Sequence, residues 1–144
     1  MYRKVYLKKG KEESLKRFHP WIFSGAIQST EGELEEGEVV RVITAGGEFI
    51  AVGHYQIGSI AVRVLSFSDV TIDDEFWSSR LRSAFRMRQS IGIVDNPHNN
   101  TYRLVHGEGD NIPGLVIDVY GDTAVMQAHS VGIQIGRASC RERV

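Results

Sequence analysis

Short apolar runs separated by glycine-containing turns fill residues 1–70, and this pattern limits the possible fold more than any other feature. The runs are KVYL, WIFSGAI, EVVRVIT, EFIAVGHYQ and IAVRVLSF. Gly46-Gly47 and Gly58-Ser59 separate the last three, and glycine supplies the positive φ angles of tight hairpin turns. Several short strands with such turns predict a small barrel or sandwich. KEESLKRF, which precedes Pro20, is expected to form a short helix.

The pattern changes near residue 70, where we predict a longer helix over about residues 73–90. Its apolar side chains fall on one face: Trp77, Leu81, Ala84 and Phe85. Thr71 is placed to cap this helix, with Asp74 three residues further on, and Gly92 is a natural stop. The segments YRLVH, LVIDVY and TAVMQAH then read as a three-stranded antiparallel meander. The predicted fold class is therefore α+β and rich in strands.

The meander is expected to lack cover on one face, because almost nothing follows residue 130 to pack against it. We interpret the second unit as an incomplete domain. Its open edges and uncovered apolar face predict aggregation or disorder beyond residue 71.

Charge is unevenly distributed along a chain whose formal net charge is −1. Residues 1–23 carry seven Lys or Arg against two Glu, a balance of +5, and residues 24–40 carry five Glu and no base. Residues 76–91 add four arginines and no acid. A basic cluster can bind phosphate on a neutral chain, because its field is local and screened within about 10 Å. Composition alone favours a solvated face instead.

Other motifs give little support for catalysis or metal binding. GEGDNIPG fails the dinucleotide-binding pattern because its third glycine position holds Ile112 and a strand follows. The five histidines have no metal-ligand spacing, and no Ser-His-Asp context is recognisable. A single cysteine, no signal peptide and no long apolar run favour a cytoplasmic protein without a membrane partner.

The stretch KKGKEESLKRFHPWIFSGAI interleaves basic residues with Phe18, Trp21 and Phe23. Single-stranded nucleic acid binds cations through its backbone and aromatic rings through its bases. Taken alone, Trp21 and Phe23 are interpreted as packing the barrel.

This stretch, together with GEFIAVGHYQIGSIAVRVLSF and YRLVHGEGDNIPGLVIDVYGDTAVMQAHSVG, resembles the N-terminal part of a bacterial family. These are the 23S rRNA cytosine-5 methyltransferases that begin with a PUA domain, and the resemblance covers residues 3 to about 133. It implies that residues 1–70 are a PUA-like pseudobarrel that binds RNA. It also implies that residues 71–133 are the start of a linking α/β domain.

With the resemblance included, six residues become candidate RNA-binding residues: Lys8, Lys9, Lys11, Arg17, His19 and Trp21. The expected partner is ribosomal RNA, with no DNA, and the oligomeric state stays open. The family uses S-adenosylmethionine and a catalytic cysteine, both in a C-terminal domain without a counterpart here. We therefore expect this chain to have no catalytic, cofactor-binding or metal-binding residues, and to be inactive alone.

The last residues, 134–144, are interpreted as a non-native tail. IGRASCRERV, residues 135–144, is what one frame of a common short-read sequencing adapter encodes. Cys140 is then not a nucleophile, and the chain is a fragment truncated before the catalytic domain. Two alternatives remain: a stand-alone PUA-type RNA-binding module without enzymatic activity, and an unrelated small β-barrel without a nucleic-acid role.

Overall fold

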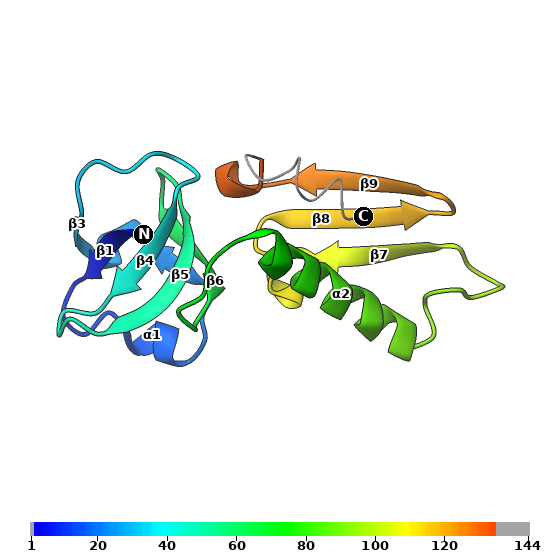
Figure 1. The fold of residues 1–144 in the computed structure, drawn as a ribbon, viewed down its shortest axis with the longest axis horizontal. Coiled ribbons are helices and arrows are strands. Elements are labelled where there is room, and N and C mark those ends of the chain that lie inside the picture. Colours follow the sequence, from blue (N-terminus) through cyan, green and yellow to red (C-terminus); the bar gives the residue numbers. More distant parts are fainter. Residues whose placement is uncertain (1, 135–144) are drawn as a thin grey trace. The chain divides into compact units, whose positions relative to one another are not determined.

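The computed structural model describes residues 2–134, which divide into two compact units that meet in sequence between Thr71 and Ile72 (Figure 1). The first unit is built mainly from strands and the second from one long helix and a small sheet. This arrangement confirms the predicted strand-rich α+β fold class. No helix among residues 2–134 is long and apolar enough to cross a membrane.

The first unit contains six strands and two short helices. In chain order they are β1 (Arg3–Leu7), α1 (Glu13–Lys16), β2 (Trp21–Phe23), the 3-10 helix η1 (Ser24–Ala26), β3 (Ile27–Thr30), β4 (Val39–Ile43), β5 (Phe49–Tyr55) and β6 (Ile60–Ser66). The strands form one sheet in the order β2-β6-β5-β4-β1-β3. Only β1 and β4 pair in parallel.

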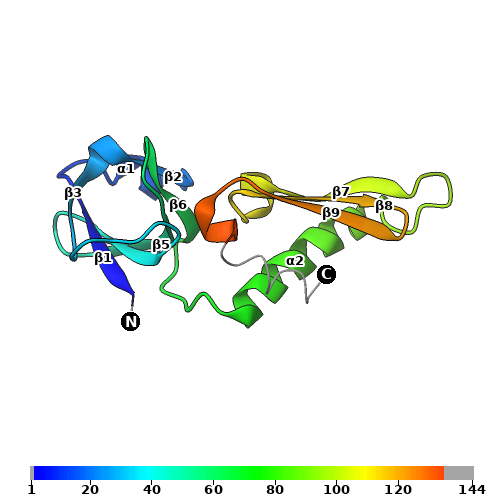
Figure 2. The ribbon, with the colours of Figure 1, turned by 90° about the horizontal axis from the view of Figure 1, so that it is seen from above.

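The run WIFSGAI does not form the single strand that its apolar residues predict. Ser24–Ala26 forms η1, which separates β2 from β3. Strand β2 pairs with β6 and β3 pairs with β1, so these neighbours in sequence lie at opposite ends of the strand order. A link of three residues can join the two ends only if the sheet curls until they approach each other. Figures 1 and 2 show this curled sheet.

Apolar side chains from most strands of the first unit meet inside the curl. The buried core consists of Val5, Leu7, Leu15, Ile22, Val40, Val42, Ala51, Val62 and Val64. Leu15 is the one core residue that α1 contributes, so this short helix is anchored through a single side chain. Close strand packing also requires Gly53 on β5. A Cβ atom there would collide with the backbone carbonyl of Arg63 on β6.

The second unit begins with α2 (Asp74–Ser90) and continues with β7 (Thr101–His106), the 3-10 helix η2 (Gly107–Asp110), β8 (Leu115–Tyr120) and β9 (Thr123–Ala128). The strands pair antiparallel in the order β7-β8-β9, which confirms the predicted meander. The predicted helix is also confirmed, but its cap is not Thr71. The side chain of Asp73 accepts the Phe76 N–H at 2.9 Å, because Asp73 is the last extended residue before the helix.

A buried ion pair joins α2 to the turn after β7. The Arg88 guanidinium donates to both carboxylate oxygens of Asp110, and its Nε donates to the backbone carbonyl of Arg103 at 2.9 Å. The two side chains are only 8% and 6% exposed. Asp110 also accepts the backbone N–H of His106 at 2.6 Å. The pair therefore fixes the C-terminal end of α2 against η2.

Candidate nucleic-acid interface

Four of the six candidate RNA-binding residues form an exposed cationic surface around α1. Lys8, Lys9 and Lys11 occupy the connection from β1 to α1, and Arg17 directly follows the helix. We call these four residues the basic surface. The Lys8 N–H donates to the Ala26 carbonyl at 2.8 Å, which ties this connection to η1. None of the four side chains forms an ion pair within residues 2–134, so their charges are available to a ligand.

The end of α1 holds Phe18 in an unusual backbone conformation. Phe18 has φ of 64°, the left-handed region that bulky residues rarely occupy. Its N–H donates to the Leu15 carbonyl at 2.9 Å, and the N–H of His19 donates to the Ser14 carbonyl at 3.0 Å. These two bonds form a Schellman cap, in which glycine normally takes the place of Phe18. The result is an aromatic ring that is 72% exposed, next to Arg17.

Three more rings gather directly after this cap. The ring centroids of His19 and Trp21 lie 6.3 Å apart, those of His19 and Phe23 6.2 Å, and those of Trp21 and Phe23 6.5 Å. We call these three residues the aromatic cluster. The backbone N–H of Trp21 donates to Nδ1 of His19 at 3.1 Å, which orients the imidazole.

The expectation that both aromatic residues of β2 pack the barrel is wrong for Phe23. Its side chain is 50% exposed, and Trp21 is partly buried. The core position of β2 belongs to Ile22, which is 3% exposed. Alternation along the strand explains this, because neighbouring side chains point to opposite faces and only one face meets the core.

A groove of about 320 Å³ joins the basic surface to the aromatic cluster. Its lining comes from α1, β2, η1 and the connection before α1: Lys11, Ser14, Leu15, Trp21, Ile22, Phe23, Gly25 and Ala26. We call it the α1–β2 groove. It places Lys11 and Trp21 in one depression, while the other candidates lie outside its lining. Sequence reasoning left Phe18 and Phe23 out of the candidate set, although both belong to the same basic and aromatic stretch.

The acidic stretch over residues 24–40 contains the ion-pair partner of Arg3. Arg3 on β1 forms a two-pronged ion pair with Glu38, and its Nη1 donates to the Glu33 carbonyl at 2.8 Å. The hydrogen bond from Arg3 lowers the pKa of the Glu38 carboxyl. Arg3 is thus already neutralised, in contrast to the basic surface.

The arginines of α2 are mostly engaged within the second unit. Arg82 pairs with Glu75 at 2.7 Å, Arg88 pairs with Asp110, and Arg80 donates to the Asn111 carbonyl at 2.8 Å. Burial lowers the pKa of Arg80. These partners explain why the arginine-rich helix is a weaker candidate for phosphate binding than its composition indicates.

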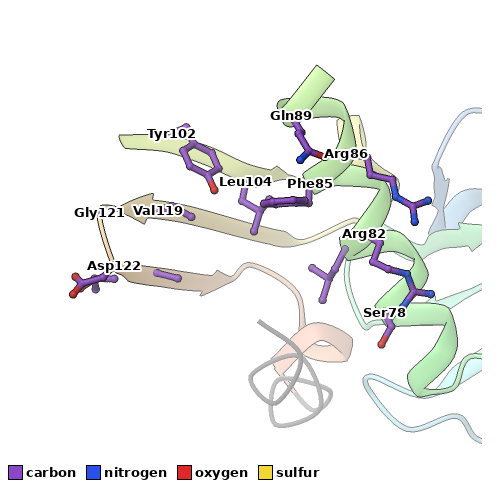
Figure 3. Close-up of a pocket in the computed structure, with 13 residues that line it drawn as sticks. Ser78, Arg82, Phe85, Arg86, Gln89, Tyr102, Leu104, Val119, Gly121 and Asp122 are labelled. Atoms are coloured by element: carbon purple, nitrogen blue, oxygen red, sulfur yellow. The ribbon is translucent and has the colours of Figure 1, made fainter. Parts of the chain in front are cut away.

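A second and larger depression lies between α2 and the strands of the second unit (Figure 3). Its volume is about 770 Å³, and Phe85 of α2 points into it toward Leu104 of β7. Arg82 and Arg86 extend outward from the helix at its rim. The lining of this α2–sheet pocket is mixed, with apolar Leu81, Val119 and Ala124 beside polar Ser78, Gln89 and Asp122. Aggregation through this face stays a prediction.

The described residues provide no metal centre and no recognisable cofactor loop. No three His, Cys, Asp or Glu side chains gather as metal ligands within residues 2–134. The GEGDNIPG segment forms η2 and then leads into β8, so it presents no helix N-terminus to a phosphate.

The first unit is similar to a known class of domain. Residues 5–67 match the family of PUA-like domains. This match begins within β1 and ends just after β6, so it includes the α1–β2 groove.

The chain is also homologous to ribosomal RNA large subunit methyltransferase I. It is 38% identical over 138 residues to the protein of that name from Erwinia tasmaniensis, and 39% identical to the one from Escherichia coli strain SMS-3-5. Each alignment covers 94% of this chain and 34% of the relative. The chain thus spans about a third of the length of the curated relatives that it matches.

Two solved structures share the fold. One is a Streptococcus mutans protein described as a SAM-dependent methyltransferase, with a TM-score of 0.82 and 18% identity. The other is described as a methyltransferase complexed with SAH, with a TM-score of 0.81 and 17% identity. They cover 99% of this chain and, respectively, 37% and 36% of their own chains. At this identity the likeness concerns the fold.

Proposed function

We propose that this chain is the RNA-binding N-terminal part of a methyltransferase that modifies 23S ribosomal RNA in the cytoplasm. In this proposal the whole enzyme transfers a methyl group from S-adenosylmethionine to C5 of a cytosine. The observation that carries it is the basic surface, which leaves four cations without ion pairs beside exposed aromatic rings. Support comes from the homology, which extends over 94% of the chain.

The two units have separate roles in this proposal. Residues 1–70 are the PUA-like RNA-binding domain, and residues 71–133 begin a linking α/β domain. The chain alone does not methylate RNA, because the cofactor site and the nucleophile belong to a further domain. The adapter-derived tail, residues 135–144, lies outside the described residues and has no role.

Electrostatics explains why the basic surface suits RNA. Each Lys or Arg that contacts a phosphate releases condensed counterions, and this release drives association. Lys8, Lys9, Lys11 and Arg17 need not break an existing ion pair to do so. Arg3 and Arg88 would have to leave Glu38 and Asp110 first. We therefore expect these four residues to contribute more to the free energy of RNA binding than Arg3 or Arg88.

The test measures RNA affinity of the 144-residue chain as a function of salt, by fluorescence anisotropy with a labelled ribosomal RNA fragment. Changing Lys8, Lys9, Lys11 and Arg17 together to Gln is expected to weaken binding at low salt. The salt slope should fall by about one for each phosphate contact that is lost. Arg86→Gln, an exposed arginine of the second unit, is the control and should leave affinity nearly unchanged. Equal affinity and slope for the quadruple variant would count against the proposal.

A methyl-transfer assay separates the two parts of the proposal. The chain is incubated with labelled S-adenosylmethionine and 23S rRNA, and incorporation into RNA is counted. We expect none above background. Turnover by the chain alone would refute the assignment of catalysis to a further domain, whatever the binding assay shows.

A further inference from the structure

We propose that the α1–β2 groove binds one unpaired nucleotide of RNA, with its base stacked on Trp21 and its phosphate at Lys11. This inference rests on the proposed RNA-binding function and makes it more specific. It assigns a ligand to a groove, and it states that the bound RNA is single-stranded at this point.

The size of the groove matches a single nucleotide. Its 320 Å³ lie at the lower end of the roughly 300–1,000 Å³ typical of small-ligand pockets. A duplex cannot enter such a depression, because its bases are paired and stacked inside the helix. A base that has left the stack presents both its faces and its edges.

The composition of the lining matches the two halves of a nucleotide. Ile22, Leu15, Trp21 and Phe23 give the groove apolar and aromatic walls, and Lys11 supplies the one charged group among its lining residues. Charge complementarity therefore places the phosphate at Lys11 and the base toward β2. Ser14 adds a hydroxyl that can donate to or accept from the sugar.

The ring geometry determines how the base lies. The planes of Trp21 and Phe23 are inclined by 87°, so one flat base cannot stack on both. A base stacked on one ring must meet the other ring edge-on. Trp21 has the larger ring system, and we assign the stacking to it, with Phe23 bordering the edge of the base.

Cations beside the groove can bind further phosphates of the same RNA strand. Lys8 and Lys9 precede Lys11 on the tied connection, and Arg17 follows α1. They are placed to contact the phosphates on either side of the bound nucleotide. The positive φ of Phe18 keeps a further exposed ring next to Arg17, where it packs in a T-shaped arrangement against Phe67 with 5.3 Å between the ring centroids.

The experiment compares a single-stranded RNA of about 12 nucleotides with the same strand annealed to its complement. Binding to the 144-residue chain is followed by tryptophan fluorescence and by anisotropy of the labelled RNA. The chain has two tryptophans, and Trp77 is buried in the second unit. Quenching that disappears in Trp21→Phe therefore reports stacking on Trp21.

Trp21→Ala is expected to weaken single-strand binding about 5- to 150-fold, as for loss of one stacked base. Phe23→Ala should weaken it by a smaller factor, and because Phe23 is half exposed this variant should fold normally. Tyr120→Ala, which removes an exposed ring from the second unit, is the matched control and should have no effect. Circular dichroism verifies that each variant folds.

The outcomes distinguish this inference from the function on which it rests. Salt-dependent binding that is equal for single strand and duplex, without quenching at Trp21, would overturn the inference and leave the proposed function standing. So would folded Trp21→Ala and Phe23→Ala variants with unchanged single-strand affinity. If neither RNA binds even at low salt, the proposed function itself fails.

Discussion

Replacing Asp110 with asparagine is expected to unfold the second unit while the first stays folded. The change removes the negative charge from a pair whose side chains are 8% and 6% exposed. Arg88 would then remain buried as an uncompensated cation, which costs about 3–5 kcal/mol. A unit of this size has a free energy of unfolding of about 3–10 kcal/mol. The loss is therefore comparable to the whole stability of the unit.

The assay is urea unfolding followed by the fluorescence of Trp77, in a Trp21→Phe background that removes the signal of the first unit. The double variant Arg88→Met with Asp110→Leu is the control, because replacing both partners by apolar residues removes the uncompensated charge. We expect it to be much closer to the parent chain than Asp110→Asn. An Asp110→Asn unfolding midpoint that matches the parent chain would refute the reasoning.

The Arg88–Asp110 pair should also make the stability of the second unit depend on pH. Burial alone would raise the pKa of the Asp110 carboxyl, but hydrogen bonds from Arg88 and the His106 backbone outweigh it and lower the pKa. A carboxyl with a lowered pKa in the folded state contributes stability above its unfolded pKa of 3.8, and that stability is lost as pH falls through the folded value. The second unit should therefore lose stability below about pH 4, and the double variant Arg88→Met with Asp110→Leu, which stays folded without this carboxyl, should flatten the dependence.

Four further substitutions probe other parts of the fold. Asp73→Ala should destabilise the second unit by about 0.5–2 kcal/mol through loss of the helix cap, whereas Thr71→Ala should stay within about 0.5 kcal/mol. Equal effects in thermal unfolding would restore Thr71 as the cap. Gly53→Ala should destabilise the first unit by about 1–3 kcal/mol, because the added methyl meets a backbone carbonyl; an unchanged melting temperature would contradict this. Burial lowers the pKa of His54 to about 4, so the first unit should lose stability between pH 6.5 and 4 as the unfolded chain takes up a proton. His54→Gln should remove that slope, and an unaltered slope would exclude His54 as its source.

The elements with strong local patterns could be predicted from the sequence. The helix that begins at Asp74 follows from its apolar spacing, and the meander follows from three short apolar runs. The cap was assigned to Thr71 because Thr71 and Asp74 match the capping-box spacing. The structure uses Asp73, which is two residues closer to the first helical turn.

Features that depend on distant contacts could not be predicted. The 3-10 turn that begins at Ser24 lies inside an apolar run. The chain must turn there because β2 and β3 pair with different strands. The Arg88–Asp110 pair joins residues 22 positions apart, so no local pattern indicates it. The exposure of the aromatic rings at the candidate interface also could not be predicted. Nothing in the sequence shows that Ile22, and not Phe23, takes the core position of β2.

The most direct test of the RNA-binding claim is an NMR titration of the labelled chain with single-stranded RNA. We expect backbone amide shifts to change around the basic surface and the aromatic cluster, from Lys8 to Lys11 and from Arg17 to Phe23. Amides of the α2–sheet pocket, such as those of Phe85 and Leu104, should stay in place. Shift changes confined to that pocket, or no shift changes at low salt, would contradict RNA binding by the first unit.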